Sequence, residues 1–315
     1  MTKAKALREY YKKIYNLDLS GMSIVAVIRD VFKKKYNLDV QGSTVSSILM
    51  NVVDQSSGES GEGVSDEFGK MIDKSIVKAV IPNGIEIIGD FVFYKCEDLK
   101  YIVIPDTVTT IGASAFSNCS SLLSVEIPKG ITTVDDSAFY KCTSLKTVVI
   151  NNGAKTIGTS MFSSCSELES ITIPDSVTSI GTNAFNGCKK LESITIPYGI
   201  TTISDSMLSG CNALKNVVLP ESVVEIKTNS FSGCKAMEEI ELPSSVTTIG
   251  NSAFYNCIAL SKITVKATTP PTITASSFNS VPADCAIYVP AGSVDTYKSA
   301  NNWSARADYI QAITE

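Results

Sequence analysis

Residues 168–190 read LESITIPDSVTSIGTNAFNGCKK, and near-copies of this segment follow one another along most of the chain. A repeat this short cannot bury its own apolar face and must stack on its neighbours, so the sequence predicts a solenoid. The cysteines give a 23-residue period: Cys96, Cys119, Cys142, Cys165, Cys188, Cys211, Cys234 and Cys257. An apolar residue keeps the same step: Ile76, Leu99, Leu122, Leu145, Leu168, Leu191, Leu214, Met237 and Leu260.

Each unit contains the pattern of two short strands. The alternation over 170–173 predicts a strand with residues 171 and 173 facing the core. Pro174 has no N–H group for a strand ladder, so it ends this strand, and 177–180 reads as a second one. A tight helical turn is then expected to bring Phe185 inward, and Cys188 closes the unit as a small buried apolar residue.

The chain is predicted to contain four segments. Residues 1–53 form a small all-α head, and 54–75 form a Gly/Ser linker with an N-terminal cap. Residues 76–281 form a β-rich solenoid, a leucine-rich repeat array of about nine 23-residue units. The pattern fades after Leu260, and 282–315 are expected to form a C-terminal cap with a strand, a short helix and a terminal strand.

The head carries apolar residues at helical spacing, within three expected helices at 3–15, 23–36 and 43–53. About fifty residues make a marginal core, so this apolar stripe is expected to be buried by self-association or by docking to a larger assembly. The residues predicted to make this contact are Ile24, Val27, Ile28, Val45, Ile48, Leu49 and Val52.

The composition excludes several classes of function. The chain has no histidine, which removes the usual general base and histidine-bearing zinc sites. A net charge of −5 argues against nucleic acid as a partner. The N-terminal residues are charged where a signal peptide is apolar, so no export signal is expected, and no apolar run is long enough to insert into a membrane.

No metal or cofactor is expected from the cysteines, because no two lie closer than one repeat period and zinc ligands come in tighter clusters. We expect a ladder of free, buried thiols. Two turns carry Asp135, Asp136 and Asp205. These turns are either solvated or hold a cation, and the sequence leaves both possibilities open.

The outward side chains of the first strand in each unit are the remaining candidates for binding. The early units expose Tyr and Val, the middle units Ser and Thr, and the late units Glu. Exposed aromatic and apolar side chains mark contact surfaces, although valine is also common in strands without any such role. The predicted binding residues are Lys78, Tyr101, Val103, Glu126, Val149, Glu239 and Glu241.

The unit LxxIxIPxxVxxIGxxAFxxCxx resembles the leucine-rich repeat of the BspA-like bacterial surface proteins. The tail IYVPAGSVDTYKSANNWSARADYIQAI resembles a C-terminal cap found in many of them. Over residues 76–315 the resemblance implies a non-enzymatic recognition or adhesion scaffold on a bacterial surface. Its partner would be a protein or glycan on a host or neighbouring cell. The alternative is a phage virion protein, a fibre or decoration, because the head is similar to phage fibre attachment pieces.

Overall fold

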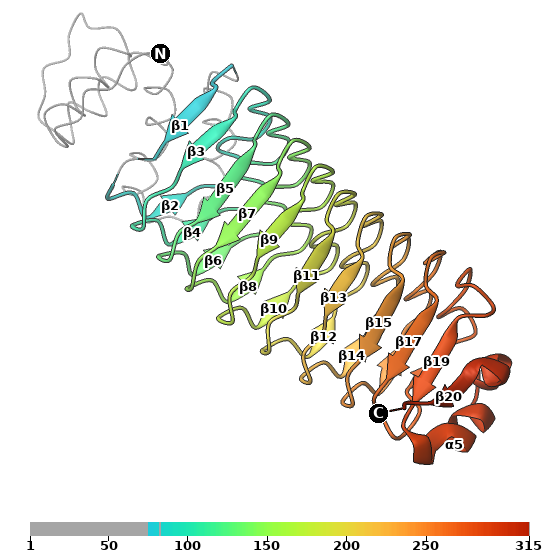
Figure 1. Ribbon diagram of the computed structural model, residues 1–315. Helices are drawn as coiled ribbons and strands as arrows, with labels where there is room; N and C mark the ends of the chain where they lie inside the picture. The colour runs from blue at the N-terminus through green and yellow to red at the C-terminus, as the bar shows by residue number, and fades with distance from the viewer. Residues whose placement is uncertain (1–74, 82, 315) are drawn as a thin grey trace, which may run out of the picture.

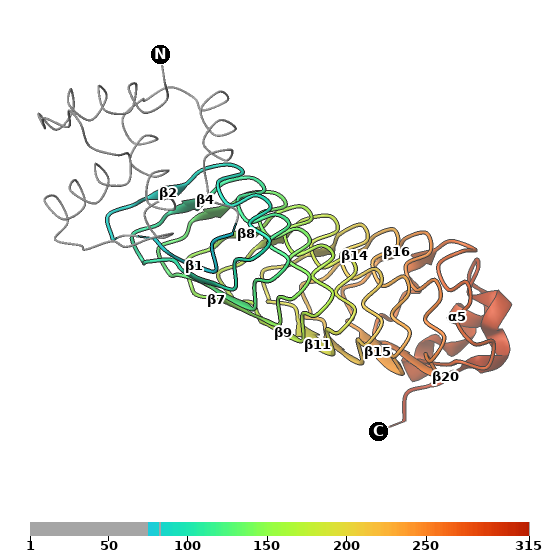
Figure 2. The ribbon, with the colours of Figure 1, turned by 90° about the horizontal axis from the view of Figure 1, so that it is seen from above.

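Short strands, repeated unit by unit along one axis, form an elongated array in the computed structural model (Figures 1 and 2). The structure describes residues 75–81 and 83–314. The predicted head, the linker and N-terminal cap, and the seven apolar head residues therefore lie outside the described residues.

The first strands of successive units form one parallel row, and those that pair do so in register, as Ser124↔Thr147 and Thr147↔Ser170 show. We call this row ladder one. It contains β1 (Lys78–Val80), β3 (Tyr101–Val103), β5 (Ser124–Ile127), β7 (Thr147–Ile150), β9 (Ser170–Thr172), β11 (Ser193–Thr195), β13 (Asn216–Val218), β15 (Glu239–Leu242), β17 (Lys262–Val265), β19 (Ala286–Val289) and β20 (Ile310–Ala312).

The second strand of each unit forms a separate parallel row, which we call ladder two. It contains β2 (Ile87–Ile88), β4 (Thr110–Ile111), β6 (Thr133–Val134), β8 (Thr156–Ile157), β10 (Ser179–Ile180), β12 (Thr202–Ile203), β14 (Glu225–Ile226), β16 (Thr248–Ile249) and β18 (Thr272–Ile273). The predicted β-rich solenoid of 23-residue units is confirmed.

Phenylalanine rings form a stack through the core. Phe93, Phe116, Phe139, Phe162 and Phe185 follow one another with ring centroids 4.9–5.9 Å apart and nearly parallel planes. A second stack joins the last units, in which Phe231, Phe254 and Phe278 are spaced by 5.3 Å. Leu208 occupies the position between the two stacks and is fully buried.

The thiols do more than fill space. The S–H group of Cys119 donates a hydrogen bond to the carbonyl oxygen of Phe93 in the preceding unit, with a distance of 3.1 Å. The same bond recurs at every ladder cysteine from Cys142 to Cys257. The sequence pattern suggested only a small apolar residue, but the repeated thiol also links successive units.

The expected helical turn before each cysteine is wrong: residues 182–187 form hydrogen-bonded turns. Two residues per turn have left-handed backbone angles, as at Asn183 (φ 57°) and Gly187 (φ 74°), and a right-handed helix cannot accommodate them. Glycine relieves the resulting strain in the middle units, where Gly210 (φ 73°) and Gly233 (φ 77°) repeat the position of Gly187.

The array does not fade after Leu260 but lengthens by one residue. Thr248 pairs with Thr272 and Lys262 pairs with Ala286, so in both ladders this step is one residue longer than the repeat period. This single insertion hides the repeat in the sequence, and ladder one continues into β19 and β20.

A helical segment follows β19 and packs against the last units (Figure 1). It contains the 3-10 helix η1 (Ala291–Ser293), α5 (Val294–Ser299) and the 3-10 helix η2 (Ser304–Tyr309). Trp303 is buried against Phe278, with its ring nitrogen donating to the carbonyl of Pro271. The Arg306 guanidinium donates hydrogen bonds to the carbonyls of Phe278, Val281 and Pro282, so these acceptors at the end of the final turn have partners.

Candidate functional site

The outward face of ladder one holds every strand residue that we predicted to bind. The alternation along each strand places their side chains away from the core, and all are exposed. They are Lys78 on β1, Tyr101 and Val103 on β3, Glu126 on β5, Val149 on β7, and Glu239 and Glu241 on β15.

Apolar side chains gather at the N-terminal end of this face. Lys78 pairs with Tyr101 and Val80 with Val103, so that Tyr101 and Val103 lie beside β1. Half of the Tyr101 and Val103 surface is accessible (49% and 50%), whereas the inward residues of the same units are almost completely buried. Val149 lies two units farther along and is separated from Val103 by Glu126. The solenoid core does not require these exposed groups.

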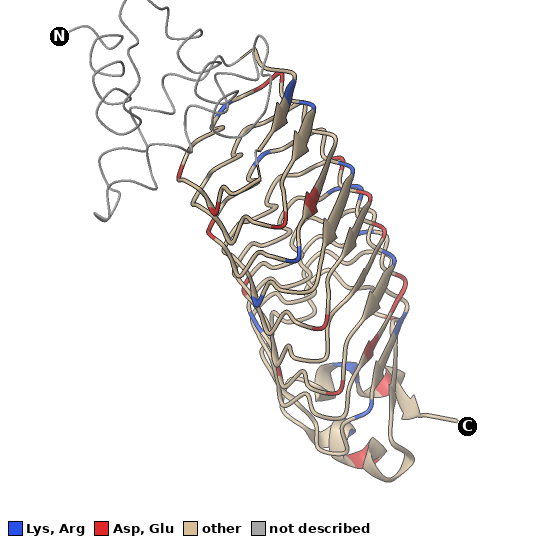
Figure 3. Cartoon of the chain, turned by 90° about the vertical axis from the view of Figure 1, so that its left-hand side faces the viewer, with Lys and Arg blue, Asp and Glu red and all other residues tan. Residues whose placement is uncertain are grey.

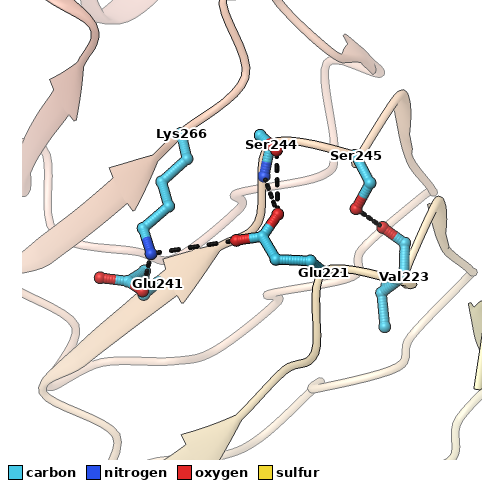
Figure 4. A network of polar contacts seen from close by, with 6 residues as sticks. All are labelled: Glu221, Val223, Glu241, Ser244, Ser245 and Lys266. Carbon is cyan, nitrogen blue, oxygen red and sulfur yellow. Dashed lines mark hydrogen bonds and ion pairs between the residues drawn. The ribbon is translucent and has the colours of Figure 1, made fainter. Parts of the chain in front are cut away.

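The sequence suggested that the late part of the face is acidic. The structure shows that lysines pair with its carboxylates, so this part carries both charges. Lys262 Nζ lies 3.1 Å from Glu239, in the adjacent rung. Lys266 Nζ lies 2.5 Å from Glu241 and 4.0 Å from Glu221 (Figure 4). These contacts raise the pKa of Lys266, chiefly through its hydrogen bond to Glu241. The charges are therefore mixed along the array (Figure 3).

Figure 4 shows the hydrogen bonds and ion pairs that join neighbouring units beside Glu241. Glu221 accepts hydrogen bonds from the backbone N–H and the hydroxyl of Ser244, at 3.1 and 2.9 Å. Ser245 donates its hydroxyl to the carbonyl of Val223 at 2.6 Å. Each bond joins one unit to the next, so Glu221 and Lys266 both fix the edge of the array.

A shallow groove of about 210 Å³ crosses ladder one over β13, β15 and β17. Its lining combines one exposed apolar side chain, Val218, with polar and charged groups. The remaining outward side chains in the lining are Asn216, Glu239, Glu241, Lys262 and Thr264. This arrangement can offer both donors and acceptors to a polar ligand while presenting little net charge.

The aspartates at the turns have structural partners. Asp136 Oδ1 accepts the backbone N–H of Thr159 at 2.6 Å, and Asp205 Oδ1 accepts that of Thr228 at 3.1 Å. Burial, with smaller contributions from Asp90 and Asp136, raises the pKa of Asp135. Across residues 75–81 and 83–314, no group of three or more His, Cys, Asp or Glu residues has an arrangement suited to a metal ion.

The cysteines are all free and buried. Burial raises the pKa of Cys165 and of Cys211 to about 12, despite the opposing hydrogen bond from the preceding unit. A thiol with so high a pKa is a poor nucleophile at neutral pH, because the thiolate is the reactive form. Within the described units the thiols therefore serve packing and the hydrogen bonds between units.

Some contacts of this site were not recognised in the sequence. Glu239 and Lys262 are separated by one repeat period, and that period alone predicts that they are neighbours. Glu241 and Lys266 are separated by slightly more than one period, and their contact depends on the path of the chain after β17. Among the described residues, no helix is long and apolar enough to span a membrane.

Comparison with known proteins now identifies the repeat. The family described as the BspA type leucine rich repeat region (6 copies) matches residues 70–190 and 155–283, which is more than half of the chain. The chain belongs to the BspA-type leucine-rich repeat family. No match was found among curated proteins.

Several solved structures resemble this BspA-type protein. A leucine-rich repeat protein of T. pallidum is 32% identical, with a TM-score of 0.50, and the match covers 52% of this chain and 78% of that one. A leucine-rich cell surface protein of Faecalibacterium prausnitzii is 26% identical, with a TM-score of 0.38 and coverage of 76% and 80%. A leucine-rich repeat protein from Bacteroides ovatus is 24% identical, with a TM-score of 0.33 and coverage of 75% and 77%.

Proposed function

We propose that this BspA-type protein is a non-enzymatic recognition or adhesion scaffold, and that the outward face of ladder one binds its partner. The partner is a protein or glycan on the surface of a host or neighbouring cell. The protein is displayed on a surface and held there by its N-terminal head. The description of the F. prausnitzii relative as a cell surface protein supports this location.

One observation carries the proposal. Inward positions keep buried apolar residues in every unit, since packing requires them, while the outward positions of ladder one vary in chemical type along the array. Tyr101, Val103 and Val218 expose between 49% and 57% of their surface there. Burial of exposed apolar groups by a partner lowers the free energy of the complex, and tyrosine is enriched at protein interfaces.

The proposal is tested by binding of the labelled full chain to cultured epithelial cells and to bacterial cells. The double variant Tyr101→Ser/Val103→Ser should lose at least about 90% of bound protein, which corresponds to roughly 1.4 kcal/mol. Ile258→Ser is the matched control, because Ile258 is 54% exposed but lies in a loop outside ladder one. Equal loss of binding by both variants would reject the strand face as the site.

Pretreatment of the cells identifies the partner class. Protease-sensitive binding indicates a protein, and glycosidase-sensitive binding indicates a glycan. Binding by neither cell type, with folded protein, would count against the adhesion role itself.

The role of the head is tested separately. Because residues 24–52 carry an apolar stripe, the full chain should self-associate or dock to a larger assembly. A chain that starts at residue 66 should instead stay monomeric. Light scattering on the two chains measures this difference, and the same oligomeric state for both would count against attachment through the head. The phage fibre alternative stays a prediction from the sequence of the head.

A further inference from the structure

One junction in the array differs from all the others in its strand pairing. Between neighbouring units at least one ladder normally continues, as β4–β6 does where β3 and β5 are not paired. Between the fifth and sixth units, neither ladder continues. Across the described residues, no strand pairing joins β9 to β11 or β10 to β12.

A substitution accompanies this interruption in ladder two. At most other junctions the backbone N–H of the residue after the second strand donates to the preceding unit, as Gly181 does to Ile157 and Lys227 to Ile203. The equivalent residue here is Ser204, and its hydroxyl donates to the carbonyl of Ile180 at 2.5 Å. The side chain takes the acceptor that the backbone amide uses elsewhere.

The aromatic stack is interrupted in the same unit. Leu208 replaces the phenylalanine that the other units carry at this position, so that Met207-Leu208 stands where the preceding unit has Ala184-Phe185. The ring of Phe185 therefore stacks on Phe162 but meets Leu208 on its other side, and ring stacking resumes at Phe231. Two ring contacts are lost, although both replacement side chains are fully buried.

The turn side of the junction remains closed. Backbone N–H groups of Asn183, Phe185 and Gly187 donate to the unit that follows, at 2.7–3.0 Å. The Cys211 thiol also donates to the carbonyl of Phe185. The two halves are thus joined mainly along the turn side, while the strand side keeps the Ser204 hydroxyl bond but lacks the backbone strand pairing of the other junctions.

We infer that this junction is a built-in seam at which the array opens into two cooperative blocks, residues 75–190 and 191–314. In a repeat array, stability is a sum of unit terms and nearest-neighbour terms, so the weakest interface separates first. The seam lies between the apolar end of the ladder-one face at Tyr101 and Val103 and the groove over β13–β17. Opening therefore changes the geometry between these two parts of the face.

The buried thiols report this opening directly, because each can be alkylated only when its junction separates. The native full chain is treated with N-ethylmaleimide at neutral pH, and labelled cysteines are mapped by mass spectrometry over time. Cys188 and Cys211, which flank the seam, should react about tenfold faster than Cys142, which lies inside a continuous stack. Cys96 and Cys285 are left out because fraying of the ends exposes them independently.

Two paired variants connect the rate to the proposed cause. Met207→Ala/Leu208→Phe restores the common Ala-Phe pair and should slow labelling of Cys188 and Cys211 to the rate of Cys142. Ala138→Met/Phe139→Leu adds a second interruption of the ring stack, in the third unit, and should accelerate labelling of Cys119 and Cys142.

Hydrogen exchange of the unmodified chain gives a readout that needs no variant. Peptides from 189–204 should exchange faster than the equivalent peptides from 212–227. Equal labelling rates for Cys142, Cys188 and Cys211, or fast labelling of the last two that the repair leaves unchanged, would overturn the inference. So would equal exchange of the two peptides.

Discussion

Replacement of Phe139 by leucine isolates the contribution of the aromatic stack to stability. Phe139 is completely buried, and its ring lies 5.1 Å from that of Phe116 and 5.6 Å from that of Phe162. An aromatic pair contributes about 0.5–1.5 kcal/mol beyond the burial of its area, so loss of two pairs should cost about 1–3 kcal/mol. Phe185 has a ring neighbour on one side only, Phe162 at 5.9 Å. Phe185→Leu should therefore cost about half as much.

The comparison is made by urea unfolding of the full chain followed by circular dichroism. Both variants remove the same atoms from a buried position, so the difference between their unfolding midpoints reports the second ring contact. The slope of the unfolding free energy against urea concentration should be the same for both variants as for the parent, which shows that unfolding exposes the same buried surface in all three. If Phe185→Leu costs as much as Phe139→Leu or more, the stacked rings do not stabilise the array in the way described.

Three further predictions concern the buried thiols, the left-handed turns and the C-terminal segment. Thiol titration of the native chain should detect almost none of the ladder cysteines at pH 8, and all nine cysteines after denaturation, because burial holds the pKa of Cys165 and Cys211 near 12; fewer than nine would indicate disulfides. Gly210→Ala should destabilise the chain by about 1 kcal/mol, since its φ of 73° disfavours a side chain, and an unchanged melting temperature would contradict that strain. Arg306→Ala should cost about 3 kcal/mol by removing the donors to three carbonyls of the final turn, and thermal unfolding measures the loss.

The sequence predicts the stacked fold because packing requires the same residue at the same place in each unit. The inward placement of Phe185 and Cys188 follows from the 23-residue period, and the structure confirms it. The turns were harder to predict, since no residue type alone indicates left-handed angles: Ser114, Lys141 and Gly210 all adopt them. The helical turn was therefore the wrong expectation.

The sequence predicts which residues lie on the outward face of ladder one, but only some of the contacts that they make. Alternation along the strands places Tyr101 and Glu239 outside. It does not reveal that Lys266 reaches Glu241, because that contact depends on the chain path beyond the strand. The insertion after β17 was hidden for a related reason: one extra residue destroys the sequence period, while the register of the ladders simply absorbs it.

The most direct test of the central claim leaves only serine and threonine on the outward face of ladder one in β1, β3, β5 and β7, as in β9 and β11. The substitutions change Lys78, Val80, Tyr101, Val103, Glu126 and Val149, all exposed, so the melting temperature should stay close to that of the parent. Cell binding of the full chain is then measured beside a control with six exposed changes on ladder two. We predict that the first variant loses binding and the control retains it. Retained binding by the first variant, with both proteins folded, would contradict the assignment of the face.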